Sequence, residues 1–416
     1  MRILNYGRMY KMENETQTAL ISEKNFNRML LKFYILDGLK QAFFYIPILV
    51  IYYQGIMDRE IQVAILLSIK TFSVNLLEIP TGFVADHISR KVSVLLGVFI
   101  SIISLGIIVL FQNFWWLCVA QFLFALSETL SSGADKAFLF DNLKYYNKQI
   151  MYDKVNCNMH FNSSLILSLS FITGGILYNY WEMSPFVLSI ILFIVSFIVG
   201  LTIHEENYDE VDSSGNRLKK MKAFYRIKTQ SKKLWFYIIY TSVIRSFFYS
   251  VYLFIYPLLL ISNTIPKPYF GIVYSAAVLI YGFGSKLSVN IRNISRFIVI
   301  YVSLFTGVLY VVIGFNTNAL IFIGLIMFVR LIWGAFAVIS NNEINKMIKQ
   351  SSVRSTILSV ANAIGNVFSS GLIFIYGILL NSIVLKNVMI VTGILLICLG
   401  LLSVLVKRFC NTIMSS

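Results

Sequence analysis

The chain has 416 residues, of which 57% are hydrophobic and only 13% are charged. That charged share is about half of what a soluble domain carries, and one soluble core could not bury so much apolar surface. The net charge of +16 is accompanied by no nucleic-acid-binding motif, so we expect it to reflect membrane topology and expect no nucleic-acid partner.

The apolar residues form blocks of helix length, and residues 95–110 and 388–405 contain no charge at all. A bilayer core requires about 20 apolar residues per helix. Lipid admits only helices or closed barrels as spanning structures, and the short alternating segments of a barrel are absent. The sequence therefore predicts an all-α membrane protein with twelve transmembrane helices in two six-helix halves.

Six spans are predicted in the first half of the chain and six in the second. In the first half they run from Leu30 to Tyr53, Ile61 to Ala85, Val92 to Phe111, Phe114 to Phe138, Asn156 to Tyr180 and Pro185 to Ile203. In the second half they run from Leu234 to Ile261, Tyr269 to Val289, Phe297 to Phe315, Ala319 to Ser340, Thr356 to Leu380 and Val388 to Val406.

Polar segments divide the chain and set its orientation. The predicted order is a cytoplasmic tail (1–29), a first half (30–203), a cytoplasmic linker (204–233), a second half (234–406) and a second tail (407–416). Lysine and arginine are concentrated in the linker and in every second loop, whereas the opposite loops offer only Arg59, Lys267 and Lys386. The positive-inside rule then predicts a multi-pass protein of the cytoplasmic membrane with both termini in the cytoplasm.

The two halves show a weak internal repeat. Gly133 and Ala134 precede Asp141 and Asn142 at the same spacing at which Gly334 and Ala335 precede Asn342 and Glu343. Repeated halves are typical of secondary transporters, whose binding sites lie between the repeats.

The most specific motif lies between the second and third spans and reads Gly82-Phe-Val-Ala-Asp86-His-Ile-Ser-Arg90-Lys91. It resembles the signature loop of the major facilitator superfamily, although His87 and Ser89 replace the usual arginine and glycine. The resemblance implies that Gly82, Asp86, Arg90 and Lys91 form a loop that locks a cytoplasmic gate. Three further stretches are similar to bacterial efflux-type members: residues 78–82, residues 132–135 with 140–141, and residues 354–359.

Ionisable residues inside a span are costly and are functional candidates by default. We take Asp37, Glu78 and Glu128 as proton-coupling candidates. Asp37 and Lys40 lie three residues apart and could instead neutralise each other on one helix face. Glu78 lies near the signature loop and could be structural. Glu128 has no partner nearby in the sequence. Arg330 could hold Glu128 or another acid as a fixed pair, or it could approach Glu128 in one state of the cycle.

The resemblance implies that the first, fourth, seventh and tenth spans line a central cavity. Aromatic rings and a few charges there would suit amphiphilic, cationic or zwitterionic compounds, unless the rings serve packing alone. We expect Lys70 to extend toward a membrane face. The cavity candidates are Lys40, Arg245, Phe248, Tyr249, Tyr252, Arg330 and Trp333.

These patterns favour a secondary transporter that exports a small drug-like or peptide-like compound by proton antiport. The alternatives are uptake by the same fold, or a membrane sensor or scaffold.

The fifth span reads Thr173-Gly174-Gly175 without the proline of many antiporters, and Gln121 stands where many proton-coupled members have arginine. No P-loop, HExxH or GxSxG motif is present, so we expect a non-enzyme. We expect its partners to be a substrate, protons and lipid, we expect no cofactor or metal, and we expect a monomer.

Overall fold

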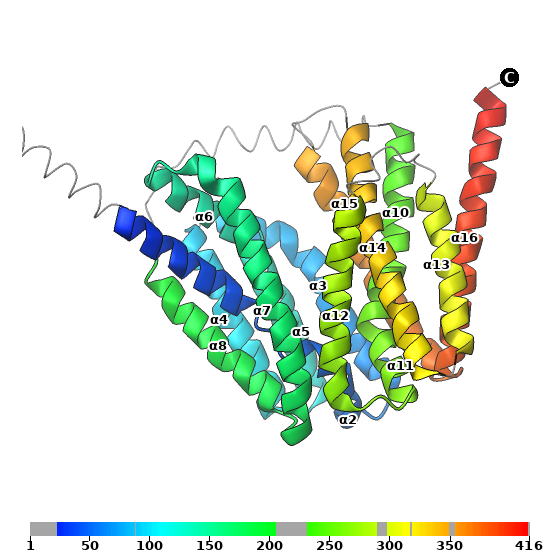
Figure 1. Ribbon diagram of the computed structural model, residues 1–416, viewed down its shortest axis with the longest axis horizontal. Coiled ribbons are helices and arrows are strands. Elements are labelled where there is room, and N and C mark those ends of the chain that lie inside the picture. Colours follow the sequence, from blue (N-terminus) through cyan, green and yellow to red (C-terminus); the bar gives the residue numbers. More distant parts are fainter. Residues whose placement is uncertain are drawn as a thin grey trace, which may run out of the picture.

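The computed structural model describes residues 23–87, 89–204, 231–288, 298–316, 318–348 and 354–414, and these residues contain helices and no strands (Figure 1). Ten of the described helices are long and apolar enough to cross a membrane, and two shorter apolar helices, Ile46–Ile56 and Tyr301–Phe315, complete a set of twelve. The predicted fold class, twelve transmembrane helices in two six-helix halves, is confirmed.

The amino-terminal half begins with a helix over residues 23–40. The elements that follow it are η1 (Ile46–Ile48), α2 (Leu49–Ile56), α3 (Glu60–His87), α4 (Arg90–Leu110), α5 (Phe114–Ser131), α6 (Ala134–Tyr145), η2 (Gln149–Met151), α7 (Tyr152–Tyr180) and α8 (Ser184–Leu201).

The carboxy-terminal half has a similar arrangement. Its elements are α10 (Lys232–Ser250), the π-helical turn η3 (Val251–Ile255), α11 (Tyr256–Ser262), α12 (Lys267–Leu287), α13 (Ile298–Phe315), α14 (Ala319–Met347), α15 (Arg354–Leu380) and α16 (Leu385–Met414).

Three of the twelve predicted spans are interrupted rather than continuous. The first breaks after residue 40, and Pro47 lies in the first turn of the piece that follows. The fourth breaks at Gly133, whose φ of 83° lies in the left-handed region that glycine tolerates. The seventh widens into η3 just before Pro257, whose ring nitrogen cannot donate to the preceding turn. Hydrophobicity alone did not reveal these breaks.

The halves meet chiefly at two helix pairs, α7 with α12 and α3 with α15, and also where η1 contacts α12 and α2 contacts α11. Glycines bring the backbones together at these crossings: Gly175 of α7 lies on the backbone of Gly271 in α12, and Gly377 of α15 lies on Ala64 of α3. Small residues at helix crossings are how membrane helices pack closely. We call the end of the bundle that holds Tyr180 and the start of α12 the closed end.

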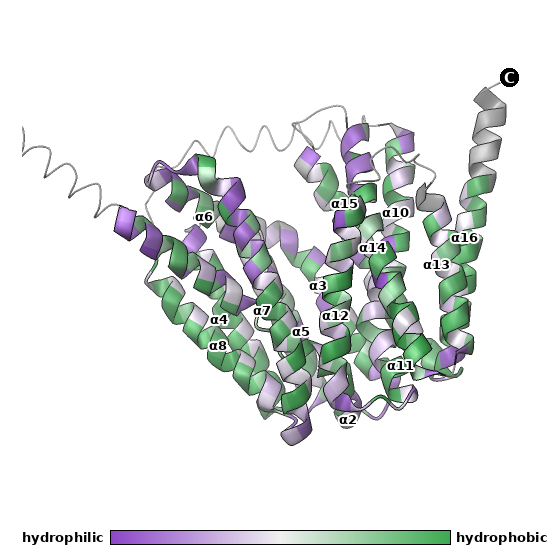
Figure 2. Ribbon diagram, viewed as in Figure 1, coloured by the Kyte–Doolittle hydropathy of each residue, from purple (hydrophilic) through white to green (hydrophobic). Residues whose placement is uncertain are grey.

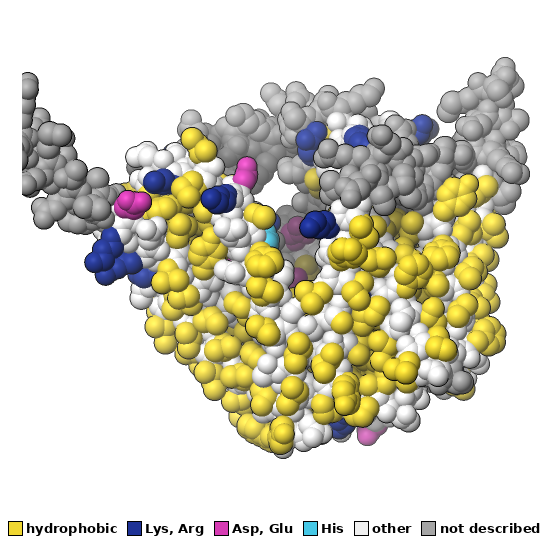
Figure 3. Space-filling view, viewed as in Figure 1, with side chains coloured by type: hydrophobic (Ala, Val, Ile, Leu, Met, Phe, Trp, Pro, Cys, Tyr) yellow, Lys and Arg dark blue, Asp and Glu magenta, His cyan; other side chains and the backbone are white. Residues whose placement is uncertain are grey.

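At the other end, which holds the start of α4 and the end of α6, the two groups of helices diverge in Figure 1. The space-filling view in Figure 3 shows a hollow between them. We call this the open end. Asn366 of α15 still donates to Asn75 of α3 at 3.2 Å, about midway along both helices, so the halves touch from the closed end to about mid-depth.

Large apolar side chains are exposed around the flanks of the bundle, among them Leu110, Trp115, Phe315 and Leu320. On the face that Figure 3 shows, hydrophobic side chains dominate between the two ends, and the helices in Figure 2 are mostly hydrophobic over the same stretch. An apolar belt of this extent would not be stable in water. It places the lipid around the flanks and both loop-bearing ends outside the hydrocarbon.

Candidate functional site

A cavity of 710 Å³ lies between the two halves at mid-depth, and both halves line it. The amino-terminal half contributes the bend after residue 40 together with α3, α5 and α7, and the carboxy-terminal half contributes the α10–η3 segment, α12 and α14. The cavity is therefore bordered by all three interrupted spans. Its walls are mainly aromatic and aliphatic, and its ionisable lining residues fall into three groups.

The first group is an ion pair between Lys70 of α3 and Glu128 of α5, whose Nζ and Oε2 atoms lie 3.1 Å apart. Both residues line the cavity, and 55% of the Glu128 side chain is exposed to it. The expectation that Lys70 extends toward a membrane face is therefore wrong. The sequence offered one signal for its role, since Lys70 stands near the middle of an apolar span where a lysine is costly without a partner.

The second group lies nearer the open end. Lys40 Nζ lies 3.4 Å from Asp135 Oδ2 and 3.7 Å from Asp37 Oδ1. Ser163 Oγ donates a hydrogen bond of 2.5 Å to Asp37 Oδ2. Lys40 and Asp135 line the cavity, whereas Asp37 stands behind them. Asp37 and Lys40 do neutralise each other, and Asp135, which the sequence did not single out as ionisable, completes the group.

The third group is Arg330 of α14 alone. Its guanidinium carbon lies 4.0 Å from the ring centre of Tyr252, 4.4 Å from that of Trp333 and 5.0 Å from that of Tyr281. Nε donates to the backbone oxygen of Ala277 at 3.1 Å. Arg330 is only 5% exposed, and its Nη1 has no hydrogen-bond partner among the described residues. The expected pairing of Arg330 with Glu128 is not found, because Glu128 pairs with Lys70 and Arg330 lies among rings.

Of the remaining candidate residues, some line the cavity and others lie behind its wall, where they hold helices together. Tyr249 and Tyr252 line the cavity. Phe248 does not: it is 2% exposed and stacks parallel on Trp333 with ring centres 5.9 Å apart. Arg245 also lies outside the lining, since it donates to Asn341 and Asn362, both at 2.9 Å. Phe248 and Arg245 therefore hold α10, α14 and α15 together behind the cavity wall.

The model for the family described as "Major Facilitator Superfamily" matches residues 39–373. The chain belongs to this superfamily. Solved structures of transporters have the same fold as this chain. The interrupted spans and the cavity that both halves line agree with a multi-pass membrane transporter. No curated protein matches the chain at a significant level.

Three solved structures illustrate the likeness of fold. A point mutant of the nucleoside transporter NupG superposes with a TM-score of 0.76 at 14% identity, covering 90% of this chain and 98% of that one. A bacterial homologue of the human lysosomal transporter Spinster, inward-facing and unoccupied, gives 0.70 at 13% identity, covering 93% and 97%. The POT family transporter PepTSo gives 0.67 at 11% identity, covering 92% and 98%. At these identities the likeness establishes the fold alone.

The superfamily's signature loop lies at the open end of this member. Arg90 forms an ion pair with Asp141 of α6 and donates to the backbone oxygen of Ala137 at 3.4 Å. Ser89 caps α4 by accepting from the backbone nitrogen of Val92 at 3.1 Å. The side chain of Asp86 and the surroundings of Gly82 lie outside the part of the chain that the structure describes. The described contacts of Arg90 thus tie the loop to its own half. Glu78 is half-buried on α3 and does not line the cavity.

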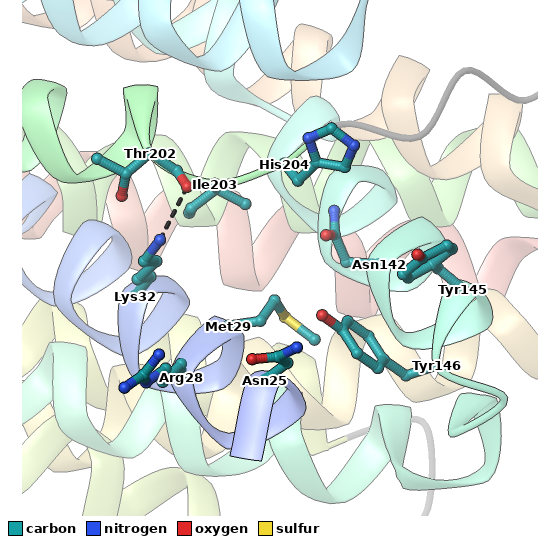
Figure 4. A pocket seen from close by; sticks show the side chains of 10 residues that line it. All are labelled: Asn25, Arg28, Met29, Lys32, Asn142, Tyr145, Tyr146, Thr202, Ile203 and His204. Carbon is teal, nitrogen blue, oxygen red and sulfur yellow. Dashed lines mark hydrogen bonds between the residues drawn. The ribbon is translucent and has the colours of Figure 1, made fainter. Parts of the chain in front are cut away.

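Lys91 ends the signature loop and caps the end of α8. Its Nζ donates to the backbone oxygens of Leu201 at 2.9 Å and Ile203 at 2.6 Å. Lys32 donates to the neighbouring oxygen of Thr202 at 2.8 Å, at the edge of a smaller hollow of 270 Å³ (Figure 4). The last carbonyls of a helix lack partners within it and favour cations. Both lysines therefore fix the end of α8 to the open end of the amino-terminal half.

Proposed function

We propose that this protein is a secondary active transporter that exports a small amphiphilic, drug-like or peptide-like compound in exchange for protons. The observation that supports this most directly is the cavity that both halves line at mid-depth. Helix crossings with glycine contacts block it at the closed end, and the halves diverge at the open end. A rocking motion of one half against the other would close one end and open the other around the same lining, which is alternating access.

The orientation of the protein in the membrane is inferred from charge, and the proposed direction of transport follows from that orientation. The open end carries the basic residues of the predicted cytoplasmic loops, among them Arg90, Lys144 and Lys346, and the closed end carries few. The positive-inside rule assigns the open end to the cytoplasm, with both termini on that side of the cell membrane. A cavity that is open to the cytoplasm is ready to take up a compound from inside the cell. One chain encloses the whole cavity, so a monomer suffices.

Proton coupling is proposed to act through the pair Lys70–Glu128, with Asp37 and its neighbours as a second acid group. Two charges about 4 Å apart attract by about 1 kcal/mol in water but by about 4 kcal/mol where the effective dielectric constant is 20. The pair is therefore weak while the cavity holds water and becomes stronger when the cavity closes. Protonation of Glu128 removes this attraction, so a proton changes the relative stability of the open and occluded states.

The test is transport by purified protein in proteoliposomes with an imposed pH gradient, using a compound that selectively inhibits growth of a deletion strain. We predict that Glu128→Gln, which mimics the protonated acid, abolishes gradient-driven accumulation yet preserves downhill exchange. Glu182→Gln is the matched control, because Glu182 forms a loose, exposed pair with Lys267 at the closed end, 3.8 Å apart. Gradient-driven accumulation at the wild-type level by both Glu128→Gln and Asp37→Asn would eliminate the coupling proposal.

A further inference from the structure

We infer that the transported compound carries an acidic group, a carboxylate or a phosphorus oxyacid, and that Arg330 binds it. This deepens the proposed function by naming the chemical class of the substrate, and it rests on the cavity being the transport site. Three observations lead to it: the balance of charge in the cavity, an unused hydrogen-bond donor on Arg330, and the way three aromatic rings are already occupied.

The first observation is the balance of charge. Among the described residues, five ionised side chains line the cavity. Lys70 is paired with Glu128, and Lys40 is paired with Asp135 and with Asp37 behind it. Arg330 has no acidic partner within the described part of the chain. The five lining side chains thus carry one net positive charge, and the acid behind them is held at Lys40 rather than at Arg330. An anionic ligand would supply the missing partner.

The second observation is the donor itself. The Nε atom of Arg330 is engaged by the oxygen of Ala277, whereas Nη1 is buried and has no partner among the described residues. A buried donor left unpaired is unfavourable, above all on a charged group. Because Arg330 lines the cavity, its guanidinium borders the space that a ligand would occupy. The planar guanidinium fits two-oxygen groups such as carboxylate or phosphate, which accept two parallel hydrogen bonds.

The third observation argues against a cationic group at this position. The faces of Tyr252, Trp333 and Tyr281 would be the natural place for a substrate ammonium. All three already lie against the guanidinium of Arg330, and a second cation there would meet a like charge. The rings hold Arg330 in position without accepting its Nη1 hydrogen bonds. Other lining rings, such as Phe43 and Tyr249, are only half-buried and can contact the apolar part of an amphiphilic acid.

Three fluorescent probes with the same aromatic body test this inference by equilibrium binding to the purified full-length protein in lipid nanodiscs. Dansylglycine carries a carboxylate, dansylglycinamide is its neutral counterpart, and dansylcadaverine carries an ammonium. Energy transfer from tryptophan to dansyl reports binding. We expect the wild type to bind the acid at least about tenfold more tightly than the amide, as for one charge-assisted hydrogen bond. The cation should bind no better than the amide.

Variants then assign the preference to Arg330. Arg330→Gln should lower the affinity for dansylglycine to that for the amide and leave the affinity for the amide within about twofold. Arg245→Gln is the matched control, because Arg245 stands in the same half but outside the lining, and it should retain the preference. A thermal melt checks that each variant is folded. If Arg330→Gln does not fold, the wild-type comparison of acid with amide decides alone.

Several results would overturn the inference: equal affinities for acid and amide, tighter binding of the cation, no saturable binding of dansylglycine, or an unchanged preference in folded Arg330→Gln. The assay measures no flux, so it separates this inference from the proposed function. A protein that prefers the acid through Arg330 but moves no compound across a membrane would refute transport and leave the acid site standing.

Discussion

The crossing of α7 and α12 at the closed end allows a single methyl group to test the account. Gly175 of α7 faces the backbone of α12, and an added Cβ would lie 2.8 Å from Gly271 N and 2.8 Å from the oxygen of Pro268. Both neighbours are backbone atoms in helices, which cannot rotate away as a side chain could. Gly175→Ala must therefore push the two halves apart at this point.

The size of the effect follows from the cost of overpacking, about 1–3 kcal/mol for an extra carbon in a well-packed site. This penalty applies only while the closed end is closed, because the two helices separate when it opens. A free-energy difference of that size changes the ratio of two conformations by about 5–150-fold. We therefore predict that Gly175→Ala shifts the population toward a state that is open at the closed end.

The assay is a distance measurement between spin labels at the closed end, one at Leu110 of α4 and one at Leu320 of α14. These exposed positions belong to opposite halves. Gly175→Ala should add a longer component to the distance distribution. Gly282→Ala is the matched control, because a Cβ at this position of α12 meets nothing within 4 Å. Identical distributions for the wild type and Gly175→Ala would refute the reasoning.

Two further predictions concern the signature loop and the cavity wall. Asp86→Asn should preserve expression and probe binding but slow turnover, because the gate would lock less well, and a wild-type transport rate in proteoliposomes would remove Asp86 from the gate. Tyr249→Ala should weaken binding of dansylglycine by about 1–3 kcal/mol through lost ring contact, whereas an unchanged dissociation constant would make Tyr249 a packing residue.

The fold could be predicted from the sequence because the signal was long and simple. Uncharged blocks of about 20 residues leave few alternatives to spanning helices. The interruptions within the spans could not be predicted in this way, as a comparison of Gly133 with Gly334 shows. Both precede an alanine in related contexts, yet Gly133 lies between α5 and α6 with a positive φ, and Gly334 lies inside α14, where the backbone of Tyr281 leaves no room for a Cβ. Only the surrounding helices distinguish these two uses of glycine.

The sequence indicated which residues line the cavity better than it indicated which of them contact each other. Arg330, Glu128, Lys40, Tyr249, Tyr252 and Trp333 do line one cavity. The partner of Glu128 was missed, because Lys70 is 58 residues away and only the packing of α3 on α5 brings the two together. Likewise, Trp333 stands one turn from Arg330 on the same helix, whereas Tyr252 and Tyr281 reach it from other helices. Contacts between helices carry no signature in a single sequence.

The central claim is that one cavity is reached from one side of the membrane at a time. The most direct test is the labelling of Val278→Cys, a cavity-lining position, with a membrane-impermeant maleimide in sealed vesicles of each orientation, after removal of the four native cysteines. We predict fast labelling from the face that holds the open end, and a shift toward the opposite face when Gly175→Ala is added. Equal labelling from both faces, or rates that Gly175→Ala leaves unchanged, would contradict the account.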